Sequence, residues 1–167
     1  MEQAQQRATS AERQHILAVD YGRARIGLAI ADAATKMPKP LATLERINRN
    51  EDMRRLRELV RDQGVKHIIV GLPLRLDGTR GEMAEEAERF AQRMAKQIGV
   101  PVELVDERLT SWEAARLLEE ELGRVIRGGA KSKGASSSVG ANSVDAMAAT
   151  VILRDYLERL REPGPII

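Results

Sequence analysis

The stretch HILAVDYGRARIGLAIAD, residues 15–32, decides the fold of this chain. Its aliphatic residues 16–19 have no polar interruption, which predicts a strand covered on both faces at the centre of a sheet. Side chains alternate between the faces of a strand, so Asp20 shares a face with Ala18, whose small side chain leaves room beside the carboxylate. A carboxylate at the end of such a strand meets solvent where catalytic groups are commonly placed.

A tight basic turn follows this strand. Gly22 and Gly27 bracket the turn, so we expect the chain to reverse and return as an antiparallel strand over residues 26–31. Aspartate also commonly begins turns, so this stretch alone leaves two roles for Asp20, one catalytic and one structural.

Composition limits the chemistry that the chain can perform. Its 167 residues, of which 43% are hydrophobic, suffice for one domain with a proper core. The absence of cysteine excludes disulfides, thiol catalysis and thiolate metal sites. The two histidines, His15 and His67, each begin an apolar strand, so a metal would be held by carboxylate oxygens and water. Such ligands favour Mg²⁺ or Mn²⁺ over zinc.

Charge and hydropathy suggest a cytoplasmic protein. The net charge is +2 and the isoelectric point about 9.1, which is compatible with a nucleic-acid partner without demanding one. No apolar run approaches the length of a membrane span, so we expect no membrane partner. We predict a disordered polar leader over residues 1–13, one domain over 14–161 and a short tail over 162–167.

Strands and helices alternate after the opening hairpin. We expect a strand over residues 41–47 after a proline-rich connector, and then a helix that is capped by Asn50 and ended by Gly64. A strand over 66–71 should follow. The next helix has an apolar stripe from Met83 to Ile98 and ends at Gly99, and it leads to a strand over 102–105. The arginines of the first helix alternate with acids, which favours a solvated, ion-paired face.

A second strand ends in acids, because Asp106 and Glu107 follow residues 102–105. Thr110 and Glu113 then have the spacing of a capping box, so a helix is expected to start there. Near a helix N-terminus the two acids could equally be ordinary residues that interact with the helix dipole.

Residues 123–143 are rich in glycine and serine and contain no acid. We expect a mobile loop over about residues 124–142, with a concentration of positive charge that suits phosphate groups. A plain flexible loop is the structural alternative.

The last expected helix spans residues 144–160, capped by Asn142 or Ser143, and has an acid in its first turn. Helical spacing predicts that Asp145 lies on one buried stripe with Ala148, Ala149, Ile152 and Tyr156. A buried acid is unfavourable unless something compensates its charge, so a metal-binding or catalytic role is favoured over a helix-dipole role. Together, Asp20, Glu107 and Asp145 predict an oxygen-rich site for divalent cations that cleaves phosphodiesters.

Four motifs carry a family resemblance. In order, they are DYGRARIGLAIAD, VGLPLRLDGT, VDERLTS and VDAMAATVILRDYL, and the match runs from about residue 16 to residue 157. They resemble the pre-16S rRNA nuclease family, which is also called Holliday-junction-resolvase-like. The resemblance implies an α/β ribonuclease H-like fold: a five-stranded mixed sheet of order 3-2-1-4-5 with helices on both faces.

The same resemblance implies an activity and a site. The acidic triad of the family falls on Asp20, Glu107 and Asp145, with Asp106 as a rival for the second place. The implied reaction is Mg²⁺- or Mn²⁺-dependent cleavage at the 5′ end of the 16S ribosomal RNA precursor, with four-way DNA junctions as the alternative substrate. A homodimer is suggested by analogy with resolvases.

Candidate phosphate contacts complete the expectation: Arg23, Arg25, Arg108, Lys131 and Lys133. Here the sequence departs from the family, because Lys131 and Lys133 are followed by GASSSVGANS instead of forming a compact basic cluster. Two other classes compete with a nuclease. An actin-like nucleotide-binding module is disfavoured by the length of the chain, and a catalytically silent nucleic-acid-binding protein remains open.

Overall fold

The computed structural model describes residues 14–75, 77–107 and 144–161. These residues form a five-stranded sheet of order β3-β2-β1-β4-β5, which confirms the predicted order. The strands are β1 (His15–Asp20), β2 (Arg25–Asp32), β3 (Pro38–Glu45), β4 (Val65–Leu72) and β5 (Val102–Asp106). The pairs β1/β2 and β2/β3 are antiparallel, whereas β1/β4 and β4/β5 are parallel. The opening stretch therefore supplies the central strand and its antiparallel neighbour.

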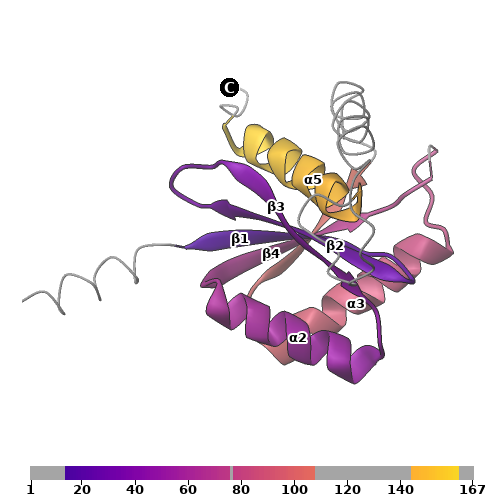
Figure 1. Ribbon diagram of the computed structural model, residues 1–167. Helices are drawn as coiled ribbons and strands as arrows, with labels where there is room; N and C mark the ends of the chain where they lie inside the picture. Colours follow the sequence, from indigo (N-terminus) through magenta and orange to yellow (C-terminus); the bar gives the residue numbers. More distant parts are fainter. Residues whose placement is uncertain (1–13, 76, 108–143, 162–167) are drawn as a thin grey trace, which may run out of the picture.

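Three described helices cover the two faces of the sheet. Helix α5 (Val144–Arg161) lies on one face, and α2 (Arg49–Asp62) and α3 (Glu82–Ile98) lie on the other (Figure 1). Each face has its own apolar cluster. Leu17 and Val19 of β1 belong to the cluster under α2 and α3, while Ala18 belongs to the one under α5. This alternation is the predicted one, and it continues with Asp20 on the α5 face.

The boundaries of two elements differ from the prediction. Helix α2 is capped by Asn48 instead of Asn50, because Asn48 has an extended backbone and its side chain accepts a hydrogen bond from the Glu51 amide at 2.9 Å. The third strand spans Pro38–Glu45 instead of 41–47, so it includes both prolines. Proline is tolerated there because β3 lies at the edge of the sheet and pairs only with β2.

The buried stripe of α5 was predicted only in part, with Ala149 and Ile152 correct. Its buried apolar residues are Ala146, Ala149, Ile152, Leu153 and Leu157, so Ala148 and Tyr156 are only partly buried. Most positions of this helix from 146 to 153 are apolar, so periodicity does not fix which row faces the sheet. Asp145 lies at the margin of the buried face, with 31% of its side chain exposed.

Several predicted segments lie outside the described residues. They are the leader over 1–13, the helix expected after Thr110, the loop over about 124–142, the cap at Asn142 or Ser143, and the tail over 162–167. Among the described helices, none combines the length and the apolar character that crossing a membrane requires.

Candidate active site

Two strands deliver acids to the same edge of the sheet. Asp20 ends β1, the central strand, and Glu107 directly follows β5. The side chains of Asp20 and Glu107 share a hydrogen bond. Of the two consecutive acids that the sequence left as alternatives, the one in contact with Asp20 is therefore Glu107, while Asp106 acts on Glu107 through its charge.

Gly71 makes room for Glu107. A Cβ atom on this residue of β4 would lie 2.2 Å from Oε1 of Glu107 and 2.8 Å from Cδ1 of Ile152 in α5. Any larger residue would push the carboxylate away from β4 or displace the helix. The missing side chain thus lets the Glu107 carboxylate lie over the sheet beside Asp20.

Gly27 makes room for the third acid, Asp145. It pairs with Asp20 across β1 and β2, and a Cβ atom there would lie only 2.0 Å from the backbone oxygen of Asp145. The first turn of α5 therefore packs directly on β2, next to the end of β1. We call the group formed by Asp20, Glu107 and Asp145 the carboxylate edge.

Crowding of the acids shifts their proton affinities. Burial, followed by the negative charge and hydrogen bond of Glu107 and the charge of Asp145, raises the pKa of Asp20 to about 7. Burial also raises the pKa of Glu107, and the charge of Asp106 adds to this effect. A hydrogen bond between two carboxyl groups requires a proton on one of them, and a cation could replace that proton.

Arg25 neutralises the third acid. Its Nε donates to Oδ2 of Asp145 at 3.0 Å, and more than half of the Arg25 side chain is exposed. This predicted phosphate contact therefore lies at the carboxylate edge. Arg23 lies elsewhere, because its guanidinium binds Glu86 at 2.8 Å and approaches Glu82 at 3.5 Å on α3.

The remaining predicted contacts, Arg108, Lys131 and Lys133, lie outside the described residues. Two structural residues of the site were missed as such. Gly27 was interpreted only as part of a turn, and Gly71 only as part of a strand. A glycine inside a strand is itself a signal of close approach by another segment, and this signal could have found both positions.

The chemistry of the acids fits a hard divalent cation. Every candidate ligand is a carboxylate oxygen, and burial together with the neighbouring carboxylates raises the pKa values of Asp20 and Glu107, so a bound cation would stabilise their ionised forms. In the described ranges, no three His, Cys, Asp or Glu side chains already form a geometry that could hold one ion. The carboxylates instead contact each other and Arg25.

Comparison with known families identifies the chain. The model of the family described as "RuvX: Holliday junction resolvase" matches residues 14–159. The chain belongs to this family of nucleases. This membership confirms the resemblance and the enzyme class that the motifs predicted.

Relatives agree over nearly the full length. The chain is 42% identical over 143 residues to a protein of Anaeromyxobacter sp. (strain K), covering 86% of this chain and 96% of the relative. It is 36% identical over 157 residues to a protein of Burkholderia multivorans (strain ATCC 17616 / 249), covering 94% and 97%. Both relatives are named "Putative pre-16S rRNA nuclease".

Solved structures confirm the ribonuclease H-like fold. A fowlpox virus resolvase, in complex with Holliday junction DNA, superposes with a TM-score of 0.52 at 14% identity, covering 89% of this chain and 99% of that one. RuvC of T. thermophilus, in complex with a Holliday junction substrate, gives a TM-score of 0.50 at 17% identity, covering 88% and 96%. At this identity the likeness concerns the fold alone.

Proposed function

We propose that the chain is a divalent-metal-dependent endonuclease that hydrolyses phosphodiester bonds in 5′-end maturation of the 16S ribosomal RNA precursor. The observation that carries this proposal is the hydrogen-bonded pair of Asp20 and Glu107, with raised pKa values, beside Asp145. The names of the relatives support the RNA substrate.

In this proposal the three acids hold Mg²⁺ or Mn²⁺. Bound divalent ions supply positive charge to the scissile phosphate and favour deprotonation of the attacking water. Asp20 and Asp145 serve as ligands, and Glu107 is a ligand or orients the water. Because their pKa values are raised, Asp20 and Glu107 bind a cation only after losing the proton that they share.

Basic side chains neutralise the phosphates that flank the cut. Arg25 is positioned for this role, because it already contacts the carboxylate edge through Asp145. Arg23, Arg108, Lys131 and Lys133 are proposed as further contacts. We propose that the enzyme acts in the cytoplasm.

The second candidate is a resolvase of four-way DNA junctions. The description of the family favours it, and the same acids would cut DNA by the same chemistry. A homodimer is part of this alternative, because a two-fold dimer would present two such sites to two equivalent strands of a junction.

The test compares wild type with Asp20→Asn, and uses Asp62→Asn as the matched control because Asp62 is exposed at the end of α2. Each protein is incubated with 16S precursor RNA or a four-way junction, in Mg²⁺, Mn²⁺ or chelator. We expect metal-dependent cleavage of the precursor by wild type and the control, and a loss of at least ~100-fold in Asp20→Asn.

Each other outcome has a distinct meaning. Equal cleavage by wild type and Asp20→Asn contradicts the mechanism. Cleavage of the junction alone favours the resolvase. Binding of either substrate by wild type without any cleavage identifies a silent nucleic-acid-binding protein.

A further inference from the structure

A second polar site lies on the α2/α3 face of the same sheet. It is a cavity of about 290 Å³ that opens beside Tyr21, the residue that follows Asp20. Four arginines line it: Arg46, Arg49, Arg89 and Arg93. We call this cavity the arginine pocket. It is a concentration of positive charge in a chain whose net charge is only +2.

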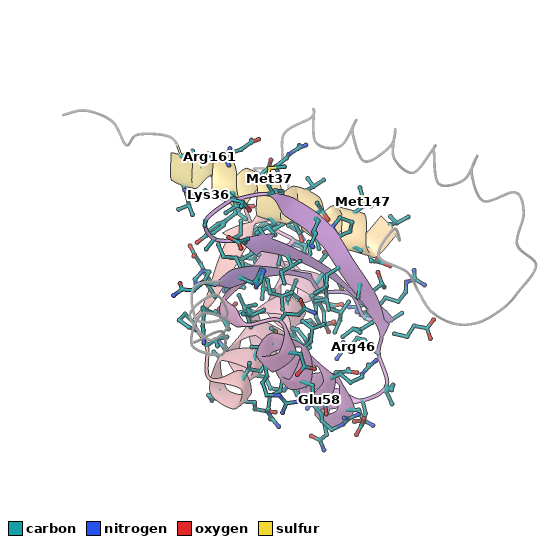
Figure 2. The ribbon with its side chains drawn as sticks, turned by 60° about the vertical axis from the view of Figure 1, so that its left-hand side comes forward. Lys36, Met37, Arg46, Glu58, Met147 and Arg161 are labelled. Carbon is teal, nitrogen blue, oxygen red and sulfur yellow. The ribbon has the colours of Figure 1, made fainter. Side chains whose placement is uncertain are left out.

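One side of the arginine pocket is fixed. Arg46 is only 17% exposed, its Nε donates to Asp52 at 3.1 Å, and its Nη1 donates to the Tyr21 hydroxyl at 2.9 Å. Its guanidinium also lies 5.1 Å from the centroid of the Tyr21 ring. Figure 2 shows Arg46 beside α2, across the sheet from α5. A buried, multiply bonded guanidinium is a preorganised donor that needs little ordering when an anion binds.

Among the described residues that line the pocket, the one acid is Glu86, which is already ion-paired. Glu86 accepts two short contacts from Arg23 and a hydrogen bond from the Tyr21 hydroxyl at 3.2 Å. These contacts, with the charge of Arg89, lower the pKa of Glu86. Its carboxylate therefore accepts from Tyr21 and is paired mainly with Arg23, which does not line the pocket.

Two of the arginines have no hydrogen-bonded acid among the described residues. In the described ranges, Arg49 and Arg93 make no hydrogen bond or ion pair, and the structure brings them together from α2 and α3 at one cavity. Other arginines of α2 are paired: Arg54 binds Glu51 and Glu58. The sequence predicted a solvated, ion-paired face for this helix, and Arg49 is the exception to it.

We infer that the arginine pocket binds a backbone phosphate of the nucleic-acid substrate. This inference rests on the proposed function and extends it to a second contact point. Guanidinium groups that converge without acidic partners suit a phosphate, which offers several acceptor oxygens. Tyr21 and Asp20 are consecutive residues, so the pocket and the carboxylate edge lie at the same end of β1, on opposite faces of the sheet. The pocket would hold a phosphate of the same substrate on the other face of the sheet from the phosphate that is cut.

The test removes one charge from each helix at the pocket. The double variant Arg49→Gln/Arg93→Gln is compared with Arg61→Gln/Lys96→Gln, which removes one charge from α2 and one from α3 outside the pocket. The dissociation constants of precursor RNA and of a four-way junction are measured with Ca²⁺ in place of Mg²⁺, over a series of salt concentrations. Thermal melting checks that all proteins are folded.

We expect the pocket variant to lose about 10-fold in affinity near 0.15 M salt. The slope of log affinity against log salt concentration should become less steep by about one to two, because fewer counterions are released on binding. The control pair should change affinity less than two-fold. Equal affinities and salt slopes in the two double variants would overturn the inference. If wild type binds neither nucleic acid, the proposed function itself fails.

A competition experiment distinguishes a site for backbone phosphate of nucleic acid from a site for a free phosphate compound. Inorganic phosphate and adenosine monophosphate are titrated into wild type and the pocket variant. The inference expects millimolar competition with nucleic acid at most. Tight binding of a free phosphate compound to wild type, lost in the pocket variant while nucleic-acid affinity is unchanged, would show a small-ligand site and contradict the inference.

Discussion

The two faces of one sheet edge carry opposite charges. On the α5 face, the carboxylate edge brings Glu107 and Asp145 to Asp20, whereas on the α2/α3 face the arginine pocket gathers four guanidinium groups beside Tyr21. Asp20 and Tyr21 are consecutive, and alternation at the end of β1 directs them to opposite faces. One turn of the chain can thus serve both the reaction and the binding of phosphate.

The two sites also differ in what holds them in place. The carboxylate edge depends on residues without side chains, because Gly27 and Gly71 allow α5 and Glu107 to approach. The arginine pocket depends on Asp52, which is 1% exposed and binds both Arg46 and Arg55. The first site is sensitive to added volume and the second to lost charge.

The largest effect on stability is expected from Asp52→Ala. Asp52 accepts hydrogen bonds from Arg46, Arg55 and the Ile47 amide, so its removal leaves a buried guanidinium without its counter-charge. We expect the free energy of unfolding to fall by about 3 kcal/mol, measured by urea denaturation. Asp52→Asn should lose less stability than Asp52→Ala. A loss below about 1 kcal/mol in Asp52→Ala would contradict the role of Asp52.

Adding one methyl group at Gly27 should damage the carboxylate edge. The Gly27→Ala Cβ would meet the Asp145 backbone oxygen at 2.0 Å, and a backbone atom can move only if α5 moves. We expect a loss of about 2 kcal/mol in stability and most of the cleavage activity. Gly81→Ala is the control, because a Cβ there meets only the flexible Arg75 side chain at 3.2 Å. If Gly27→Ala melted and cleaved RNA like wild type, the close packing of α5 on Gly27 would be contradicted.

Asp20→Asn should stabilise the metal-free protein at neutral pH. Below about pH 4 the carboxyl group is protonated in both the folded and the unfolded state, so the variant and wild type should be equally stable. Between about pH 4 and 7 only the unfolded carboxyl group ionises, because its folded pKa is about 7, so wild type loses stability as pH rises.

Above pH 7 the difference in stability between Asp20→Asn and wild type, which we call the gap, should remain constant. Because Asp20 shares its proton with Glu107, we expect a gap on the order of 1–2 kcal/mol at pH 8 in the presence of chelator, followed by thermal melting. Asp62→Asn, at an exposed position, should show no such gap. An Asp20→Asn variant that is less stable than wild type at pH 8 would contradict the claim that the buried Asp20 carboxylate destabilises the folded protein.

The smallest effect is expected from Arg25→Gln. The Arg25–Asp145 ion pair is partly exposed, so its loss should change stability by less than about 1 kcal/mol. Because it removes positive charge beside the acids, Arg25→Gln should bind Mn²⁺ a few-fold more tightly in calorimetric titration. Weaker Mn²⁺ binding would show that Arg25 supports the cation site instead of competing with it.

Local sequence predicted the frame of the carboxylate edge because strand alternation is a strict rule. It placed Asp20 on one face with Ala18. The strand order was implied by the family resemblance, and it agreed with three antiparallel strands followed by two strands with helical crossovers. Local sequence failed for part of the buried face of α5. In that helix, Ala146 is buried and Ala148 is only partly buried, and nothing in an almost continuously apolar segment distinguishes the two.

The arginine pocket could not be predicted from sequence spacing. Arg49 and Arg93 are separated by 44 positions, and only the packing of α2 against α3 brings them to one cavity. The choice between Asp106 and Glu107 also required three-dimensional information, because it depends on the space above Gly71. Contacts between elements, unlike periodicity within them, are decided by tertiary packing.

The division between the two faces is tested most directly by measuring binding and cleavage in parallel. Wild type, Asp20→Asn and Arg49→Gln/Arg93→Gln are assayed on the same precursor RNA, for dissociation constant and for cleavage rate at saturating RNA in Mg²⁺. The account predicts that Asp20→Asn binds RNA about as tightly as wild type without cutting it, and that the pocket variant loses more in affinity than in rate. Cleavage by Asp20→Asn at the wild-type rate would contradict it.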